Sequence, residues 1–396
     1  MFPKLRFKEF DGDLTESKLV ELTSWASGGT PAKDVPEYWG DGIPLISGAS
    51  MHTNQLYESD VKITKLGLQK GSKLALKDSI LILVRGSMLF NKIPMGITLG
   101  DVAFNQDVKC IRPKQQLAPL FLFQWLHAKE NTIQNKVTAT GIGAGKLDTA
   151  DLQNLKLYKP SLEEQTKIAT FLSAVDEKIS QLTQKHALLS QYKQGMMQKL
   201  FSQQIRFKAD DGSEFGEWEE KELKDIAEIN PKSKKLPESF IYIDLESVEK
   251  GQLLLQKNIE LQDAPSRAQR LLAKGDVLFQ MVRPYQQNNY YFNLSGEYVA
   301  STGYAQIRTK LDSKFIYYAL HEKTFLDEVM NRCTGTSYPA INSSDLSSIE
   351  ILIPCLEEQT KIANFLSSID QKIEVVAQQI EQAKQWKKGL LQQMFI

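Results

Sequence analysis

The sequence is poor in several features that would mark a secreted or membrane protein. It has three cysteines in 396 residues (Cys110, Cys333 and Cys355), and their spacing fits neither a disulfide framework nor a zinc site. The longest strongly apolar run, Ile80–Val84, is far too short to cross a bilayer. The first ten residues contain no apolar signal-peptide core. We therefore expect a protein of the reducing cytoplasm, without a membrane partner.

Motifs for metal or phosphate chemistry are also missing. The string GIGAGK at 141–146 superficially suggests a phosphate loop, but Leu147 stands where such a loop needs a hydroxyl, so a polar glycine-rich loop is expected. The four histidines (His52, His127, His186 and His321) have no metal-ligand spacing. We predict no metal site and no cofactor in this chain.

Charge is balanced overall but not along the chain. Lysines and arginines number 48, as do the acidic residues. Residues 1–159 carry 20 basic and 16 acidic side chains, whereas residues 207–353 carry 17 and 23. A protein that binds DNA alone is usually basic, because phosphate contacts supply most non-specific affinity. If this chain reads DNA, a basic partner is expected to supply much of the affinity.

An internal repeat is the strongest signal in the sequence. PSLEEQTKIATFLSAVDEKI at 160–179 returns as PCLEEQTKIANFLSSIDQKI at 354–373, an offset of 194 that continues to QYKQGMMQKLF (191–201) and QWKKGLLQQMF (385–395). Weaker matches extend upstream, from FLFQWLH (121–127) and FIYYALH (315–321) back to KDSILILVR (77–85) and GDVLFQMVR (275–283). The chain is therefore a tandem duplication of a variable domain followed by a conserved helix.

Both conserved segments have apolar residues spaced alternately by three and four, which indicates a coiled-coil seam. Pro160 and Ser161 with Glu164 predict a capping box at the first helix start, and Cys355 removes that cap from the second. Two separate amphipathic helices, each on its own domain, are the alternative. The predicted seam comprises Ile168, Leu172, Val175, Ile179, Leu182, Leu189, Ile362, Leu366, Ile369, Ile373, Val376 and Ile380.

Chain connectivity predicts the direction of the pair. The first helix leads from the first domain to the second, and the second helix leaves the second domain, so paired helices must run antiparallel. About 40 residues at roughly 1.5 Å each give a spacer of roughly 60 Å. Its pseudo-twofold symmetry suits a duplex with two half-sites. Gly195 and Gly389 occupy matched places, which close helix approach or a local break would explain.

This arrangement resembles the specificity subunit of Type I restriction–modification systems. The resemblance covers the full length, and its most specific features are the P-x-LEEQTKIA-x-FL helix starts at 160 and 354, with GGTPAKDVPEYWGDGIPLIS at 28–47. It implies a first target-recognition domain (1–159), a central spacer helix (160–205), a second recognition domain (206–353) and a C-terminal spacer helix (354–396). We expect mixed α/β domains, with runs such as 79–86 and 276–283 as strands, 119–130 as helix, and more helix than strand overall.

The resemblance also implies function and partners. Each domain would read half of a bipartite site in double-stranded DNA, and the helices would set the spacer and dock two adenine-N6 methyltransferase (M) subunits. Those subunits bind S-adenosylmethionine, and restriction (R) subunits use ATP and Mg²⁺. The chain itself would be non-catalytic: its nearest match to the Asn/Asp-Pro-Pro-aromatic loop is Asn230-Pro231-Lys232-Ser233. A coiled-coil adaptor, a DNA-binding protein without a methyltransferase partner and a self-contained modifying enzyme are the alternatives.

Residues that read bases are expected in polar loops, because Arg and Lys pair with guanine and Asn or Gln with adenine. Arg85 and Arg283 end matching strand-like runs, seven residues after Asp78 and Asp276; a structural Asp–Arg pair is favoured there over DNA contact. The segment PYQQNNYY (284–291) is either a base-reading loop or a solvated turn between strands. The candidate DNA-binding residues are Ser47, Ser50, Arg85, Asn105, Gln106, Thr140 and Lys146 in the first domain, and Lys232, Lys234, Arg283, Tyr285, Gln286, Gln287, Asn288, Thr336, Ser337 and Tyr338 in the second.

Overall fold

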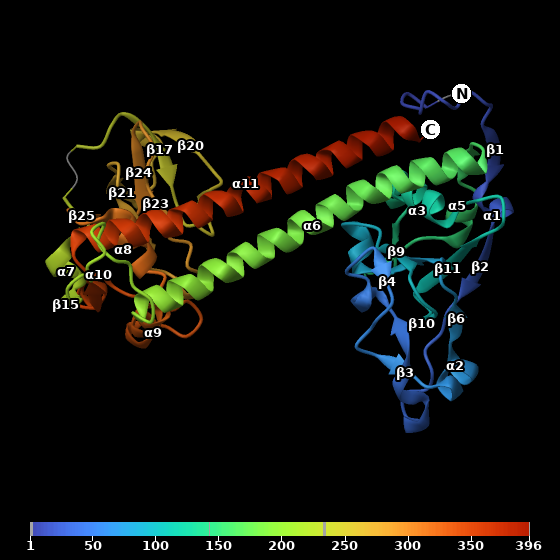
Figure 1. Cartoon of the computed structure of the whole chain (residues 1–396), viewed down its shortest axis with the longest axis horizontal. Helices are drawn as coiled ribbons and strands as arrows, with labels where there is room; N and C mark the ends of the chain where they lie inside the picture. The colour runs from blue at the N-terminus through green and yellow to red at the C-terminus, as the bar shows by residue number, and fades with distance from the viewer. Residues whose placement is uncertain (1–2, 142, 233–234, 396) are drawn as a thin grey trace. The chain divides into compact units, whose positions relative to one another are not determined.

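The computed structural model describes residues 3–141, 143–232 and 235–395. The chain folds into two compact units, residues 1–183 with 378–396 and residues 184–377. Each unit combines one mixed α/β domain with part of both long helices, α6 (Leu162–Phe201) and α11 (Leu356–Met394), which Figure 1 labels. These units cut across the predicted helical segments 160–205 and 354–396, because each helix contributes to both units.

The two long helices start at the predicted positions but are anchored differently from the prediction. Ser161 Oγ accepts a hydrogen bond from the Glu164 backbone N–H at 3.3 Å, which is the expected N-cap. The Glu164 carboxylate does not complete a capping box; it accepts two hydrogen bonds from the Arg6 guanidinium, both at 2.7 Å. In the second copy Arg206 binds Glu358 in the same way. A buried charge pair therefore fastens each helix start to its domain.

Within each unit the two helices pack side by side in opposite directions. In the first unit, Lys387 of α11 bonds Asp176 of α6 at 2.5 Å, and a small groove is lined by Leu182 and Gln379. Later α11 residues thus meet earlier α6 residues. In the second unit, Lys193 bonds Asp370 at 2.6 Å, while Leu200 shares a core cluster with Ile362. The predicted antiparallel helix pair is confirmed.

The heptad residues divide their burial between the partner helix and the domain core. Ile168, Leu172 and Val175 belong to the core of the first unit together with Leu390 and Met394 of α11. Ile362, Leu366 and Ile369 have the same role in the second unit. Leu182, Val376 and Ile380 are also buried, and the partly buried seam residues are Ile179, Leu189 and Ile373.

The matched helix glycines do not mark a contact or a break. Both helices continue without interruption through Gly195 and Gly389. A Cβ added at either position would meet no atom within 4 Å outside its own helical turn. Nothing in the structure explains these two glycines.

The first domain packs sheets around strand β7, whose four residues are all buried. Its sheets have the strand orders β1-β14, β5-β3-β10-β6, β2-β11-β7-β9-β4 and β12-β13-β8. Helix α3 (Pro119–Ala128) buries Phe121, Trp125 and Leu126 in the same core. The strands are β1 (Thr15–Lys18), β2 (Thr23–Ser27), β3 (Trp39–Ile46), β4 (Gln55–Leu56), β5 (Lys62–Ile63), β6 (Lys73–Ala75), β7 (Ile80–Leu83), β8 (Arg85–Gly86), β9 (Met95–Thr98), β10 (Val102–Phe104), β11 (Val108–Pro113), β12 (Thr138–Ala139), β13 (Gly145–Lys146) and β14 (Lys156–Lys159). The short helices are α1 (Leu19–Leu22), α2 (Lys65–Gly71), α4 (Glu130–Gln134) and α5 (Thr149–Gln153), with 3-10 turns η1 (Pro36–Tyr38), η2 (Gly48–Ser50) and η3 (Ser87–Phe90).

The second domain repeats this plan with β22 in the place of β7. Its sheets have the orders β15-β26, β16-β25-β22-β23, β20-β17-β24-β21 and β18-β19. The strands are β15 (Glu219–Glu222), β16 (Ala227–Ile229), β17 (Ser239–Ile243), β18 (Val248–Glu249), β19 (Gln252–Leu253), β20 (Lys257–Glu260), β21 (Ala268–Leu271), β22 (Val277–Gln280), β23 (Tyr290–Tyr291), β24 (Tyr298–Ser301), β25 (Tyr304–Thr309) and β26 (Glu350–Ile353). The helices are α7 (Leu223–Ile226), α8 (Ser313–Ala319), α9 (Lys323–Arg332) and α10 (Ser343–Ser347), with 3-10 turns η4 (Leu261–Asp263) and η5 (Pro284–Gln286). The mixed α/β prediction is confirmed, and helix exceeds strand because α6 and α11 alone contribute 40 and 39 residues.

Candidate nucleic-acid interface

Three strands of the first domain end at one edge, and their loops are joined by backbone hydrogen bonds. Strand β3 ends at Ile46, whose carbonyl accepts from the Asn105 N–H at 3.0 Å, just after the end of β10. The Val84 N–H, just after the end of β7, donates to the Asp107 carbonyl at 2.8 Å. The loops that follow all three strands therefore form one continuous surface.

A hairpin completes this surface. Lys146 of β13 pairs with Arg85 of β8 on one side and with Thr138 of β12 on the other. The hairpin is held to the end of β7 because the Leu147 N–H donates to the Val84 carbonyl at 2.9 Å. The structure thus brings the first-domain candidates to one edge: Ser47, Ser50, Arg85, Asn105, Gln106, Thr140 and Lys146.

These candidates separate into loop-forming and free side chains. Ser50 Oγ accepts from the Ser47 N–H at 2.9 Å, and Thr140 Oγ donates to the Ala144 carbonyl at 3.0 Å. Such bonds hold the loops in shape. Arg85 and Lys146 are exposed, and across the described residues neither side chain has a hydrogen-bond or ion-pair partner. Two adjacent cations are therefore available to a ligand at this edge.

Close backbone packing fixes the loop at 105–107. A Cβ at Gly28 would lie 2.1 Å from the Phe104 carbonyl oxygen and 2.4 Å from that of Asn105. Any larger residue at Gly28 would displace this loop. Asn105 Oδ1 also accepts from the Asp107 N–H at 3.1 Å. Asp107, which sequence reasoning missed, is thus a structural part of the surface.

The second domain builds the equivalent edge from different residues. Strands β17, β22 and β24 end at Ile243, Gln280 and Ser301. The Met281 N–H donates to the Gly303 carbonyl at 3.0 Å, and the Ile341 N–H donates to the Met281 carbonyl at 3.0 Å. The second of these bonds ties the segment after 340 to the end of β22, as Leu147 is tied in the first domain.

One buried side chain shapes the loop between β22 and β23. Gln280 is 1% exposed; its Nε2 donates to the Val282 carbonyl and to Gln286 Oε1, and its Oε1 accepts from the Asn288 N–H at 3.0 Å. The loop is therefore preorganised. Sequence reasoning missed Gln280, although a polar residue ending the apolar run VLFQ was a usable signal.

Most second-domain candidates lie in this loop or in the adjacent hairpin. Arg283, Tyr285, Gln286, Gln287 and Asn288 follow β22, and Tyr285 is exposed. A tight turn brings Thr334 and Ala340 together, and the Arg283 N–H donates to the Pro339 carbonyl at 2.7 Å. This turn leaves three candidates exposed: Thr336, Ser337 and Tyr338.

The two remaining candidates, Lys232 and Lys234, come from the segment that follows β16 in the sequence. Lys232 is exposed, two residues after Asn230, which is fixed to β25 by hydrogen bonds with Gln306. Lys234 lies outside the described residues.

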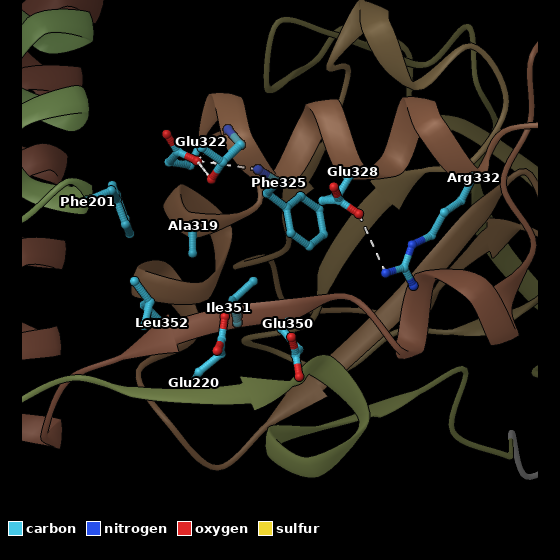
Figure 2. Close-up of a pocket in the computed structure, with 11 residues that line it drawn as sticks. Phe201, Glu220, Ala319, Glu322, Phe325, Glu328, Arg332, Glu350, Ile351 and Leu352 are labelled. Atoms are coloured by element: carbon cyan, nitrogen blue, oxygen red, sulfur yellow. Dashed lines mark hydrogen bonds and ion pairs between the residues drawn. The ribbon is translucent and has the colours of Figure 1, made fainter.

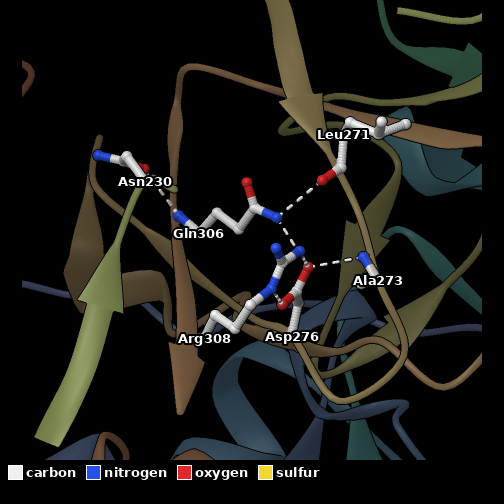
Figure 3. Close-up of polar contacts among 6 residues, drawn as sticks. All are labelled: Asn230, Leu271, Ala273, Asp276, Gln306 and Arg308. Atoms are coloured by element: carbon white, nitrogen blue, oxygen red, sulfur yellow. Dashed lines mark hydrogen bonds and ion pairs between the residues drawn. The ribbon is translucent and has the colours of Figure 1, made fainter. Parts of the chain in front are cut away.

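The predicted Asp–Arg pairs are wrong. Asp276 is buried, but its partner is Arg308, which donates from Nε and Nη2 at 2.8 Å each. Figure 3 shows this pair together with Gln306, which donates to Asp276 at 2.7 Å. The hydrogen bonds and charge of Asp276 raise the pKa of Arg308. In the described part of the first domain, no ion pair joins Asp78 to Arg85.

The predicted equivalence of Arg85 and Arg283 is also wrong, by one residue. The backbone hydrogen bonds make Val84 the counterpart of Met281. The carbonyl of each accepts from the N–H of the residue that follows the hairpin, and the N–H of each donates to the loop that follows β10 or β24. Arg85 therefore corresponds to Val282, and Arg283 corresponds to Gly86. Because side chains alternate along a strand, a shift of one residue changes the face on which each arginine lies.

A separate pocket of the second unit contains none of the candidates. It has a volume of about 350 Å³ and is lined by acidic residues and by Phe201 and Phe325. Figure 2 shows Glu220 and Glu350 on paired strands, while Glu328 lies 3.6 Å from Arg332. Among the described residues no cluster of His, Cys, Asp and Glu could hold a metal ion.

Comparison with known proteins identifies the family. A model described as the Type I restriction modification DNA specificity domain matches residues 12–191 and again residues 216–385. The chain therefore belongs to this family of Type I specificity proteins. It is a specificity subunit with two target-recognition domains.

Named relatives and solved structures agree. The Type I restriction enzyme MjaVIII specificity subunit of Methanocaldococcus jannaschii is 26% identical over 409 residues, covering 97% of this chain and 94% of that protein. The EcoR124I/EcoR124II specificity subunit of Escherichia coli is 29% identical over 182 residues, covering 46% and 45%. The crystal structure of a Type I S subunit from M. genitalium shares the fold, with a TM-score of 0.62 at 17% identity and coverage of 100% and 99%. No helix in the described chain has the length and apolar character needed to span a bilayer.

Proposed function

We propose that each domain reads one half of a bipartite double-stranded DNA site through the loop edge described above. The single observation that carries this proposal is the duplication: both domains end three strands at an edge closed by a hairpin, yet the side chains on the two edges differ. Shared architecture with different side chains suits two different half-sites, since base contacts specify sequence and scaffold contacts position the protein.

We further propose that the chain itself is non-catalytic and acts with partners. Two adenine-N6 methyltransferase subunits would dock on the paired helices and bind S-adenosylmethionine, and restriction subunits would bind ATP and Mg²⁺. The second domain is acidic, with 17 basic and 23 acidic residues over 207–353. Basic partner surfaces would therefore supply much of the phosphate affinity, in the cytoplasm where genomic DNA is available. Strong salt-sensitive DNA binding by the isolated chain would contradict the proposal that partners supply much of the phosphate affinity.

A domain exchange tests the half-site assignment. Residues 207–353 are replaced by the second recognition domain of a relative, the chain is co-expressed with its methyltransferase, and methylated adenines are mapped genome-wide. We expect one half-site to change and the other to persist. A change in both half-sites would contradict modular reading, and a pattern without two half-sites would contradict the proposed function.

Matched helix insertions test the spacer role. Seven residues are added to α6 after Thr183 and seven to α11 after Ala377, which keeps the heptad phase. The added rise of about 10 Å corresponds to roughly three base pairs of duplex. The spacer should lengthen while both half-sites persist. An unchanged spacer would contradict the role, and insertion of the same seven residues into α6 alone is the control for a disrupted pair.

A further inference from the structure

The second domain places an arginine at a backbone position that the first domain gives to glycine. Arg283 has φ 54° and ψ 54°, the left-handed region, and its counterpart Gly86 has φ 145°. Left-handed backbone is disfavoured for residues with a Cβ. Gln287, four residues later, is also left-handed, with φ 51°. Strained backbone of this kind concentrates at functional sites.

The strained arginine is held by its neighbours rather than by a carboxylate. Its backbone N–H donates to the Pro339 carbonyl at 2.7 Å, and its guanidinium carbon lies 5.6 Å from the centre of the Tyr338 ring. Tyr338 itself is 68% exposed. Arginine on an aromatic face is oriented without having its hydrogen-bond donors used. The contact with Tyr338 thus holds the Arg283 guanidinium beside the loop that follows β22.

The guanidinium lacks the bonds that a structural arginine makes. Arg283 Nε is buried without a hydrogen-bond partner in the described chain, and no ion pair to Arg283 is present among those residues. By contrast, Arg308 of the same domain is held by the buried carboxylate of Asp276. Buried donors in a structural role are normally satisfied, so Arg283 lacks the bonds that would explain it as a structural arginine.

Building on the proposed function, we infer that Arg283, oriented by Tyr338, is a specificity-determining residue that reads a guanine in the second half-site. Guanine offers N7 and O6 as a pair of acceptors in the major groove, and bidentate pairing with arginine is the commonest specific contact there. The flanking loop, braced by Gln280, would keep this guanidinium in register. The first domain has Gly86 at this position, so its half-site is read without an equivalent residue.

The test uses the full chain co-expressed with its methyltransferase subunits, with methylated adenines mapped genome-wide. In Arg283→Gln and Arg283→Lys we expect discrimination at one guanine position of the second half-site to fall about tenfold or more, with the first half-site unchanged. Tyr338→Ala should have the same effect, whereas Tyr338→Phe, which keeps the ring, should resemble the wild type. Lys310→Gln is the control: it removes an exposed cation near the Thr309 end of β25, away from the loops.

Other outcomes would overturn the inference. A uniform loss of methylation at all sites in Arg283→Gln would indicate a phosphate contact, and an unchanged second half-site would indicate no contact. Retention of the first half-site in the same cells shows that the variant folds and assembles. If the wild type itself lacked a bipartite site, the proposed function would fail. If the wild type has a bipartite site and the Arg283 variants recognise the same site, this inference alone would fail.

Discussion

Lys387 Nζ lies 2.5 Å from Asp176 Oδ1, and 194 residues away in the repeat Lys193 Nζ lies 2.6 Å from Asp370 Oδ1. The second oxygen of each aspartate accepts from the domain, from Gln124 in the first unit and from Tyr318 in the second. Each aspartate therefore joins three elements: its own helix, the partner helix and the domain core. Burial and this hydrogen bond raise the pKa of Tyr318.

Removing the lysine charge should weaken this junction. Lys387 is 12% exposed, so Lys387→Gln should lower the free energy of unfolding by about 1 kcal/mol, as expected for a partly buried charge-assisted hydrogen bond. Chemical denaturation of the whole chain measures the change. The neighbouring exposed Lys388 provides the control, since Lys388→Gln should cost less than about 0.5 kcal/mol. Equal effects of the two substitutions would contradict the assignment.

The anchors at the helix starts should matter more. Glu358 is fully buried and accepts from Arg206 and from Trp218 Nε1 at 3.1 Å; its hydrogen bonds raise the pKa of Arg206. Glu358→Ala would leave the guanidinium without its carboxylate and the indole N–H without its acceptor, at a cost of about 3 kcal/mol. Denaturation of Glu357→Ala, which removes an exposed first-turn carboxylate, should show a loss of less than about 1 kcal/mol. A small effect of Glu358→Ala would mean that the pair does not fasten the helix.

The missing cap of the second helix can be restored. Cys355 occupies the place of Ser161 and is exposed. Cys355→Ser should raise the free energy of unfolding by about 0.5–1 kcal/mol, because a serine hydroxyl can accept the N–H of Glu358. The reciprocal change Ser161→Ala should lower it by about 1 kcal/mol. An unchanged free energy of unfolding in both variants, measured by chemical denaturation, would show that these caps do not stabilise the helices.

A buried histidine should make the second unit sensitive to mild acid. His321 Nδ1 bonds the Tyr317 carbonyl at 2.7 Å and its Nε2 faces Asn289 Nδ2 at 3.3 Å. Burial, which outweighs the bond to Tyr317, lowers the pKa of His321 to about 4. Near pH 5.5 the unfolded chain, with an ordinary histidine pKa of about 6.5, binds a proton that the folded chain excludes.

The sign of the effect follows from this difference in proton binding. Stability should fall as pH drops from 7.5 to 5.5, by about 1.4 kcal/mol from this residue. Denaturation curves of wild type and His321→Gln at both pH values isolate the contribution, because glutamine does not titrate. A wild-type pH dependence that persists undiminished in His321→Gln would assign the effect to other groups.

Much of the fold was predictable because the sequence contains two copies of the same pattern. The 194-residue repeat and its heptads predicted paired antiparallel helices, and the apolar run at Ile80–Leu83 became the buried strand β7. Sheet order was beyond prediction, since pairs such as β3 with β10 join residues nearly 60 positions apart through no local signal. Glu164 illustrates a second limit: its spacing fits a capping box, but a long-range arginine competes for the carboxylate.

The candidate interface was predicted in composition better than in geometry. The candidates were expected in polar loops, whereas the structure places Arg85 and Lys146 on the paired short strands β8 and β13. The predicted equivalence of Arg85 and Arg283 was wrong because it aligned identical residue types, whereas the backbone hydrogen bonds make Gly86 the counterpart of Arg283. Asp276 was also assigned to the wrong arginine, because its partner Arg308 lies on the neighbouring strand β25 and not in the same stretch of sequence. Whether the candidates contact DNA stays a prediction.

The discontinuous first unit has a consequence for synthesis on the ribosome. Leu390, Met394 and Phe395 complete the core around Leu172 and Phe121, but they are translated after every residue of the second unit. The second unit can close its core while the first still exposes an apolar strip along α6. In a nascent chain the second unit would therefore be completed before the first, whose apolar strip would stay exposed until the end of α11 docks.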